Sequence, residues 1–105
     1  MSAKTQSQGE TETQTATRTR VERPPMYRVL LHNDDYTPMG FVVAILRDIF
    51  RRDEAESVRI MLHVHKRGVG VAGVYPHQVA ETKVHKVHET AKAEGHPLKC
   101  TMEEA

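Results

Sequence analysis

Residues 26–42 read MYRVLLHNDDYTPMGFV and contain, in order, a strand pattern, a polar loop and the start of a helix. The first six residues alternate as a strand does, with Tyr27, Val29 and Leu31 on one face. The polar residues 33–35 follow as a loop, because Asn and Asp side chains bond to their own backbone and favour turns. The first half of the stretch therefore predicts a strand that ends in an acidic loop.

The second half of the stretch begins a helix that we expect to reach about Phe50. Thr37 is placed as its N-terminal cap, and Pro38 at the first helical position, where a missing N–H costs nothing. The apolar residues then keep helical spacing through Val42, Ile45, Leu46 and Ile49. We therefore expect this helix to be largely buried.

A second helix is predicted to begin at Asp53, since Asp53 and Glu56 resemble a capping box. Gly68 is the expected end of this helix, because glycine readily adopts the left-handed backbone found after many helices. The apolar stripe between them follows i, i+3, i+4 and i+7 spacing, at Val58, Met61, Leu62 and His65.

Further along, the pattern predicts a strand over residues 69–75, a helix from Pro76 to Gly95 and a last strand. Gly70 and Gly73 indicate a bulge or a close backbone approach in the first of these strands. The core face of the helix is expected at Ala80, Val84, Val87 and Ala91, and that of the last strand at Leu98, Cys100 and Met102. We predict an α/β (α+β) fold in the order β-α-α-β-α-β, with a small antiparallel sheet of three strands packed with three helices.

The chain has 105 residues, which is room for one small domain, and its leader is not expected to join that domain. Residues 1–25 are rich in Thr, Gln, Ser and Glu and nearly free of large apolar side chains, so burial cannot offset their ordering entropy. We predict a disordered N-terminal extension over residues 1–25 and one core domain over residues 26–105.

Composition argues against several function classes. The 15 basic and 14 acidic residues give a net charge of +1 without a basic patch at helical spacing, which argues against nucleic-acid binding. The single Cys100 excludes an internal disulfide and fits a reducing compartment. No apolar run reaches membrane-spanning length or resembles a signal peptide, so we expect a cytoplasmic chain that makes no membrane contact.

The sequence also lacks a convincing catalytic or metal-binding pattern. His63 and His65 lie about 200° apart around a helix, so they cannot chelate one ion together. His85 and His88 share a face but are flanked by lysines. Cys100 has no evident base beside it. We therefore expect no metal, no other cofactor and no enzyme activity.

Three features stand apart from packing: the acidic loop at residues 33–35, the methionines Met39 and Met61, and His65. Each has a plain structural explanation, as a solvated turn, as core filler and as a hydrogen-bonded core histidine. Each also suits recognition, because the loop could meet a cationic partner and methionines can accept several apolar shapes.

Given these residues, the chain resembles the ClpS family of Clp protease adaptors. The resemblance implies an adaptor that binds the free α-amino group and the first side chain (Leu, Phe, Tyr or Trp) of N-degron substrates. It would deliver them to the AAA+ unfoldase ClpA of the ClpAP protease, acting as a monomer. The matching segments cover roughly residues 25–105 and are, in order, residues 26–42, RIMLHVH at 59–65, GVGVAGVYPHQVAETKV at 68–84 and HPLKCTME at 96–103.

The resemblance also implies roles for individual residues. The substrate ammonium has three donors, and these would be met by Asn33, Asp34 and His65, with Asp35 completing the acidic loop. Met39 would act as gatekeeper against the β-branched residues Ile and Val. The side-chain pocket would be lined by Met39, Met61, Val64 and Leu98, with Thr37 at its rim.

A second surface is implied for docking on the N-terminal domain of the unfoldase. Glu81-Thr82-Lys83 matches the family's docking helix, and Lys83 is the expected main contact. Gln78 stands where the family often has an acid, which bears on the strength of docking. Gly40 replaces a residue that is commonly charged, and glycine in a first helical turn costs up to about 1 kcal/mol.

Two other functions remain open at the level of sequence. One is a non-catalytic protein-interaction module of the same fold with a different partner, because small α/β domains host unrelated functions. The other is a small acid–base or thiol enzyme that uses Cys100. The acidic loop and the methionines favour the adaptor, since a module that binds through an open face needs neither.

Overall fold

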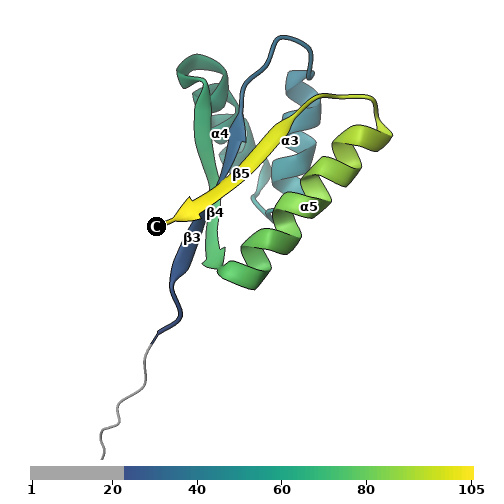
Figure 1. Cartoon of the computed structure of the whole chain (residues 1–105). Coiled ribbons are helices and arrows are strands. Elements are labelled where there is room, and N and C mark those ends of the chain that lie inside the picture. The colour runs from purple at the N-terminus through teal and green to yellow at the C-terminus, as the bar shows by residue number, and fades with distance from the viewer. Residues whose placement is uncertain (1–22) are drawn as a thin grey trace, which may run out of the picture.

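In the computed structural model, which describes residues 23–105, the strand predicted from the first stretch lies at the centre of the sheet. This strand, β3 (Met26–His32), pairs antiparallel with β4 (Val69–Pro76) and with β5 (Lys99–Glu104). The sheet order is therefore β4-β3-β5 (Figure 1). The disorder predicted for residues 1–25 falls mainly on residues 1–22, which lie outside the described residues.

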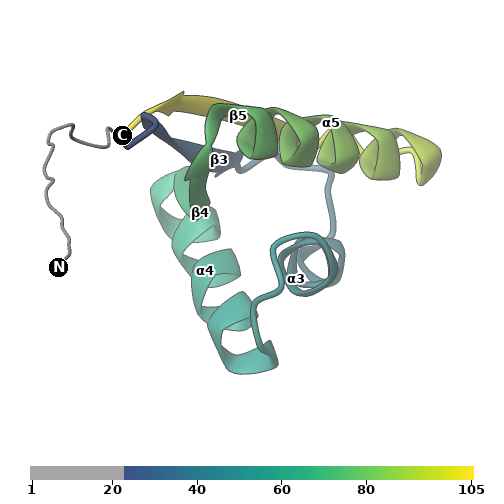
Figure 2. The same ribbon diagram turned by 90° about the horizontal axis from the view of Figure 1, so that it is seen from below.

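Three helices complete the fold: α3 (Met39–Asp48), α4 (Glu54–Arg67) and α5 (His77–Ala93). They lie on one side of the sheet, with α3 packed on α4, α4 next to β4, and α5 across the strands (Figure 2). The predicted order β-α-α-β-α-β and the three-stranded antiparallel sheet are confirmed.

The core lies between the sheet and the helices. On β3, Val29 and Leu31 are fully buried and Tyr27 packs partly against the core, as the alternation predicts. On the helices, the fully or nearly fully buried apolar residues are Val42, Val43, Ile45, Leu46, Ile60, Met61, Val64, Ala80, Val87 and Ala91. Burial of these faces fixes the positions from which the loops at the sheet's end project.

The start of α3 differs from the prediction. The cap is Pro38, in extended backbone with φ −65° and ψ 144°, and the predicted cap at Thr37 is wrong. The Thr37 hydroxyl instead donates to Asp34 Oδ2 at 2.8 Å, because the neighbouring loop competes for it. The helix also ends at Asp48 rather than near Phe50.

The start and end of α4 follow the prediction. Asp53 Oδ1 accepts the Glu56 N–H at 2.8 Å, but the return bond of a capping box is replaced by a pair between the Glu56 carboxylate and Arg59. Gly68, with φ 90°, ends the helix and donates its N–H to the Val64 carbonyl at 2.8 Å.

The buried stripe of α4 starts one residue earlier than predicted. It contains Ser57, Ile60, Met61 and Val64, while Leu62 is 40% exposed and His65 is exposed. The spacing is as predicted, but the stripe begins at a small polar residue that apolar periodicity does not count. Consequently His65 lies at the edge of the helix, where it can reach a cleft.

Strand β4 contains a bulge and a close backbone approach, the two features that Gly70 and Gly73 indicated. The pairing with β3 shifts from Val29↔Gly73 to Leu30↔Val71, which leaves Ala72 as the extra residue of a bulge. The Arg52 guanidinium donates to the Ala72 carbonyl through Nε at 3.0 Å and Nη2 at 2.8 Å, so the bulge is tied to the loop between α3 and α4.

Candidate functional site

The acidic loop after β3 is held in shape by one of its own carboxylates. Asp34 Oδ1 accepts the N–H groups of Tyr36 at 2.8 Å and Thr37 at 2.7 Å, and Oδ2 accepts the Thr37 hydroxyl at 2.8 Å. At the loop's start, Asn33 donates its N–H to the carbonyl of Gly68 at 2.8 Å. The loop is therefore fixed both internally and to the end of α4.

These hydrogen bonds also set the charge of Asp34. Desolvation, the largest single effect, raises the pKa of its carboxyl group. The hydrogen bonds from Thr37 and Tyr36, together with the nearby His96, outweigh it, and the pKa ends below its ordinary value. Asp34 is thus an ionised carboxylate at neutral pH, in a fixed orientation.

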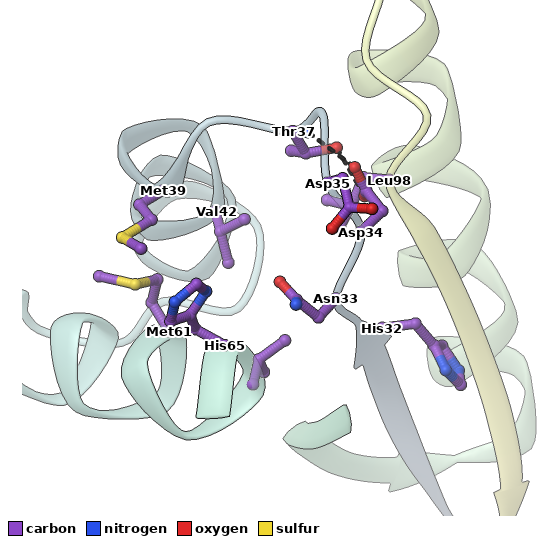
Figure 3. A pocket seen from close by; sticks show the side chains of 11 residues that line it. His32, Asn33, Asp34, Asp35, Thr37, Met39, Val42, Met61, His65 and Leu98 are labelled. Carbon is purple, nitrogen blue, oxygen red and sulfur yellow. Dashed lines mark hydrogen bonds between the residues drawn. The ribbon is translucent and has the colours of Figure 1, made fainter. Parts of the chain in front are cut away.

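A pocket of about 240 Å³ opens where this loop meets the first turn of α3, the second half of α4 and the segment before β5 (Figure 3). We call it the Leu98 pocket, after the residue on its β5 side. Its lining residues are His32, Asn33, Asp34, Asp35, Thr37, Met39, Val42, Met61, Val64, His65 and Leu98.

The Leu98 pocket is polar at its mouth and apolar at its base. Asn33, Asp35 and His65 are exposed at the mouth, and the Asn33 amide points toward the space beside His65 and Met61 (Figure 3). The base is made by buried apolar side chains, of Val42, Met61, Val64 and Leu98. A ligand with one cationic and one apolar group fits this arrangement.

The structure brings together every residue predicted for the amine and side-chain sites, since all of them line the Leu98 pocket. Two lining residues were not predicted. Val42 lies one turn after Met39 on α3, and this spacing could have identified it. His32 is the last residue of β3, but its ring turns toward β5 and its Nε2 lies 2.8 Å from Thr101 Oγ1 (Figure 3).

The residues predicted for docking lie on α5, apart from the Leu98 pocket. Gln78 and Lys83 line a shallow separate groove, and Glu81 is exposed. Lys83 also has a structural contact, because its ammonium donates to the Ile49 carbonyl at 2.7 Å and lies 5.2 Å from the centre of the Tyr75 ring. Burial, and then the charges of nearby basic side chains, lower the pKa of Lys83.

The cysteine considered as a nucleophile is inside the core. Cys100 is 2% exposed, and burial raises the pKa of its thiol to about 12. A thiol with such a pKa carries almost no thiolate at neutral pH, so it is a poor nucleophile.

Two other features are absent from the described part of the chain. Residues 23–105 contain no cluster of three or more His, Cys, Asp or Glu side chains arranged to hold a metal ion. Among the helices of that part, none has the length and apolar character needed to cross a bilayer.

Comparisons with known proteins identify one family. A family model described as "ATP-dependent Clp protease adaptor protein ClpS" matches residues 22–101. The ATP-dependent Clp protease adapter protein ClpS of Desulfatibacillum aliphaticivorans is 61% identical over 84 residues, covering 80% of this chain and 81% of that protein. The ClpS of Nitratidesulfovibrio vulgaris is 62% identical, covering 80% of this chain and 84% of its own.

A solved structure shows the same fold. Agrobacterium tumefaciens ClpS2, bound to L-phenylalaninamide, has a TM-score of 0.76 and 40% sequence identity, covering 79% of this chain and all of that one. The family match, the relatives' identity and this likeness in fold point to the same family. The chain belongs to the ClpS family of Clp protease adaptors.

Proposed function

We propose that this adaptor binds proteins through a free α-amino group and a bulky first side chain (Leu, Phe, Tyr or Trp), and delivers them to the ClpA unfoldase. One observation carries the proposal: acceptors for an ammonium and an apolar cavity share the Leu98 pocket. The N-terminal residue of a protein is where a cationic amine and an apolar side chain sit on the same carbon atom.

The polar side of the pocket has acceptors left for an ammonium. A carboxylate offers about four acceptor positions, and Asp34 uses three of them within the loop, which leaves one on Oδ2. The Asn33 carbonyl oxygen and a neutral His65 nitrogen supply two more, and the Asp35 carboxylate adds negative charge. Charge-assisted hydrogen bonds of this kind contribute roughly 1.5–3 kcal/mol each.

The apolar side supplies a comparable contribution. Burial of a Leu or Phe side chain contributes about 1.5–3 kcal/mol. Met39 and Met61 have unbranched, polarizable side chains that adapt both to flat rings and to branched Leu. In support, the ligand bound to Agrobacterium ClpS2, L-phenylalaninamide, carries a free α-amine and a phenyl side chain.

Neither contribution alone gives useful affinity after the entropy of association is subtracted, whereas the two together reach micromolar binding or better. An internal Leu or Phe would be ignored because its amide nitrogen carries no charge. The proposed activity is thus binding without catalysis.

Delivery needs a second contact, for which we propose Gln78, Glu81 and Lys83 on α5. Gln78 and Lys83 line a groove separate from the Leu98 pocket, and Glu81 is exposed on the same helix, so substrate and unfoldase could bind together. We also propose that the leader takes part in the transfer. Deletion of residues 1–20 should leave peptide affinity unchanged and slow degradation of a Phe-initiated substrate by ClpAP. Equal degradation rates for both forms would contradict this role.

The proposal is tested by a panel of twenty peptides that differ only in their first residue, each with a free amine. Fluorescence anisotropy should show binding for peptides that begin with Leu, Phe, Tyr or Trp and none for those that begin with Asp, Lys or Gly. Affinities that do not depend on the first residue would favour an interaction module with another partner.

A further inference from the structure

A second groove lies beside the Leu98 pocket. It has a volume of about 580 Å³ and runs between α5 and the segment that leads into β5. We call it the α5 groove; its lining residues are Tyr36, His88, Ala91, Lys92, Gly95, His96, Pro97 and Leu98. Leu98 lines both cavities, so the α5 groove adjoins the pocket, and Tyr36, which follows the acidic loop, lines the groove and is 79% exposed.

The α5 groove differs from the pocket in the sign of its charge. His88 and Lys92 are four residues apart on α5, so they lie on the same helix face, and His96 faces the groove from the following loop. Among the described residues that line it, none carries a carboxylate. Glu89 lies three residues before Lys92 on α5 and lines an adjoining groove with His88 and Lys92, where its carboxylate is 3.4 Å from His85 Nε2.

A hydrogen bond within the fold determines which ring nitrogen of neutral His88 carries the proton. His88 Nε2 accepts the backbone N–H of Cys100 at 3.0 Å. In the neutral ring the proton must then be on Nδ1, which makes Nδ1 a donor. The Lys92 ammonium adds a full positive charge to the groove that His88 also lines.

We propose that the residues following the bound N-terminal residue run along the α5 groove, and that an acidic side chain at one of them strengthens binding. The inference rests on the proposed function, because it assumes that the first residue occupies the Leu98 pocket. An extended chain advances about 3.3 Å per residue, so the groove is reached within the next few positions. Such an adaptor would read a short acidic signal as well as the first residue.

The test uses peptides that begin with Phe and carry Gln at positions 2 to 5, with a single Glu moved through these positions. Gln has the shape of Glu without its charge. At one position, Glu should lower the Kd about two- to five-fold at low salt, as for an exposed ion pair. The advantage should shrink in 0.5 M NaCl, because salt screens exposed charges.

Variants of the groove identify the site of the effect. Lys92→Ala should remove the advantage of Glu, and Lys92→Glu should make Lys at that position bind more tightly than Gln. Lys86→Ala is the matched control, since Lys86 is another exposed lysine of α5 that does not line the groove. It should leave the advantage intact.

Two results would overturn the inference: equal Kd values for Glu and Gln at all four positions, or an advantage of Glu that persists in Lys92→Glu. The all-Gln peptide separates this failure from failure of the proposed function. If that peptide binds while the Glu series shows no effect, only the groove is refuted. If it does not bind, the proposed function is refuted.

Discussion

Asp34 combines two roles that are usually given to different residues. Its carboxylate folds the acidic loop by accepting three hydrogen bonds from Tyr36 and Thr37, and it faces the Leu98 pocket. The neighbouring Asp35 is exposed and contributes to the pocket alone. Asp34 is therefore tied to both the loop and the pocket, whereas Asp35 is tied to the pocket alone.

Replacement of each carboxylate should have a different effect. Asp34→Ala should weaken peptide binding and also lower the free energy of unfolding by about 1–2 kcal/mol, because the loop's N–H groups lose their acceptor. Asp35→Ala should weaken binding and leave the unfolding curve unchanged. Urea denaturation and anisotropy titration of both variants measure the two effects. Equal stability of the two variants would contradict the assignment.

The stabilisation by Asp34 should depend on pH in a defined direction. The pKa of Asp34 in the folded state lies below the ordinary value. Its contribution to the free energy of unfolding is therefore complete at pH values above the pKa that Asp34 has in the unfolded chain. It is lost as the pH falls through the folded-state pKa. The difference in stability between wild type and Asp34→Ala should therefore be largest near neutral pH and should shrink as the pH falls below the ordinary pKa of an Asp carboxyl group.

Met39 should control which side chains enter the pocket. It is 45% exposed at the mouth, so its truncation widens the entrance without emptying the core. Met39→Ala should raise the affinity for peptides that begin with Ile or Val relative to those that begin with Leu. Leu62→Ala, which removes a similarly exposed side chain of α4 outside the pocket, should not. Continued rejection of Ile and Val by Met39→Ala would refute a gatekeeper.

Within the elements, replacing either of two glycines with alanine should change the free energy of unfolding in opposite directions. A Cβ at Gly70 of β4 would lie 2.7 Å from Val64 Cγ2, so strand and helix must move apart to accept it. Gly70→Ala should lower the free energy of unfolding by about 1–3 kcal/mol. A Cβ at Gly40 of α3 meets nothing within 4 Å, and Gly40→Ala should raise it by up to about 1 kcal/mol.

Denaturant unfolding of both glycine variants checks these values. The structure shows that the space around Gly40 is open. A lower free energy of unfolding for Gly40→Ala would contradict the open space found around Gly40 in the first turn of α3.

Lys83 joins two elements, which affects how its role in docking must be tested. Its ammonium bonds to the Ile49 carbonyl at the end of α3, so Lys83→Ala should lower the free energy of unfolding by about 1 kcal/mol. Glu81→Ala removes an exposed side chain and should leave stability unchanged. Both should weaken binding to the ClpA N-terminal domain, measured by calorimetry below the melting temperature of either variant. Unchanged affinity in Glu81→Ala would argue against docking through this face.

Elements and their order could be predicted from sequence because their signals are local. The alternation of apolar residues predicted β3. The Asp53 cap predicted the start of α4, and Gly68 predicted its end. The errors arose where a neighbouring element decided the outcome. Thr37 bonds to the loop before it rather than to the helix after it, and the stripe of α4 begins at Ser57, whose burial depends on packing.

At the scale of the whole molecule, the Leu98 pocket is assembled from parts far apart in sequence. The loop after β3, one face of α4 and Leu98 before β5 meet because β3 is central and the helices lie on one side of the sheet (Figure 1). Residue chemistry alone could identify the acidic loop and His65 but could not show that they share a cavity. The family resemblance supplied that grouping, and the structure places the same residues together.

We propose above all that the adaptor recognises the charge of the substrate amine and the first side chain together. The most direct measurement is the ratio of Kd values for one Phe-initiated peptide with a free and with an acetylated N-terminus. We expect at least a 100-fold loss of affinity on acetylation, about the value of two charge-assisted hydrogen bonds. Binding of the acetylated peptide within two-fold of the free one would contradict it.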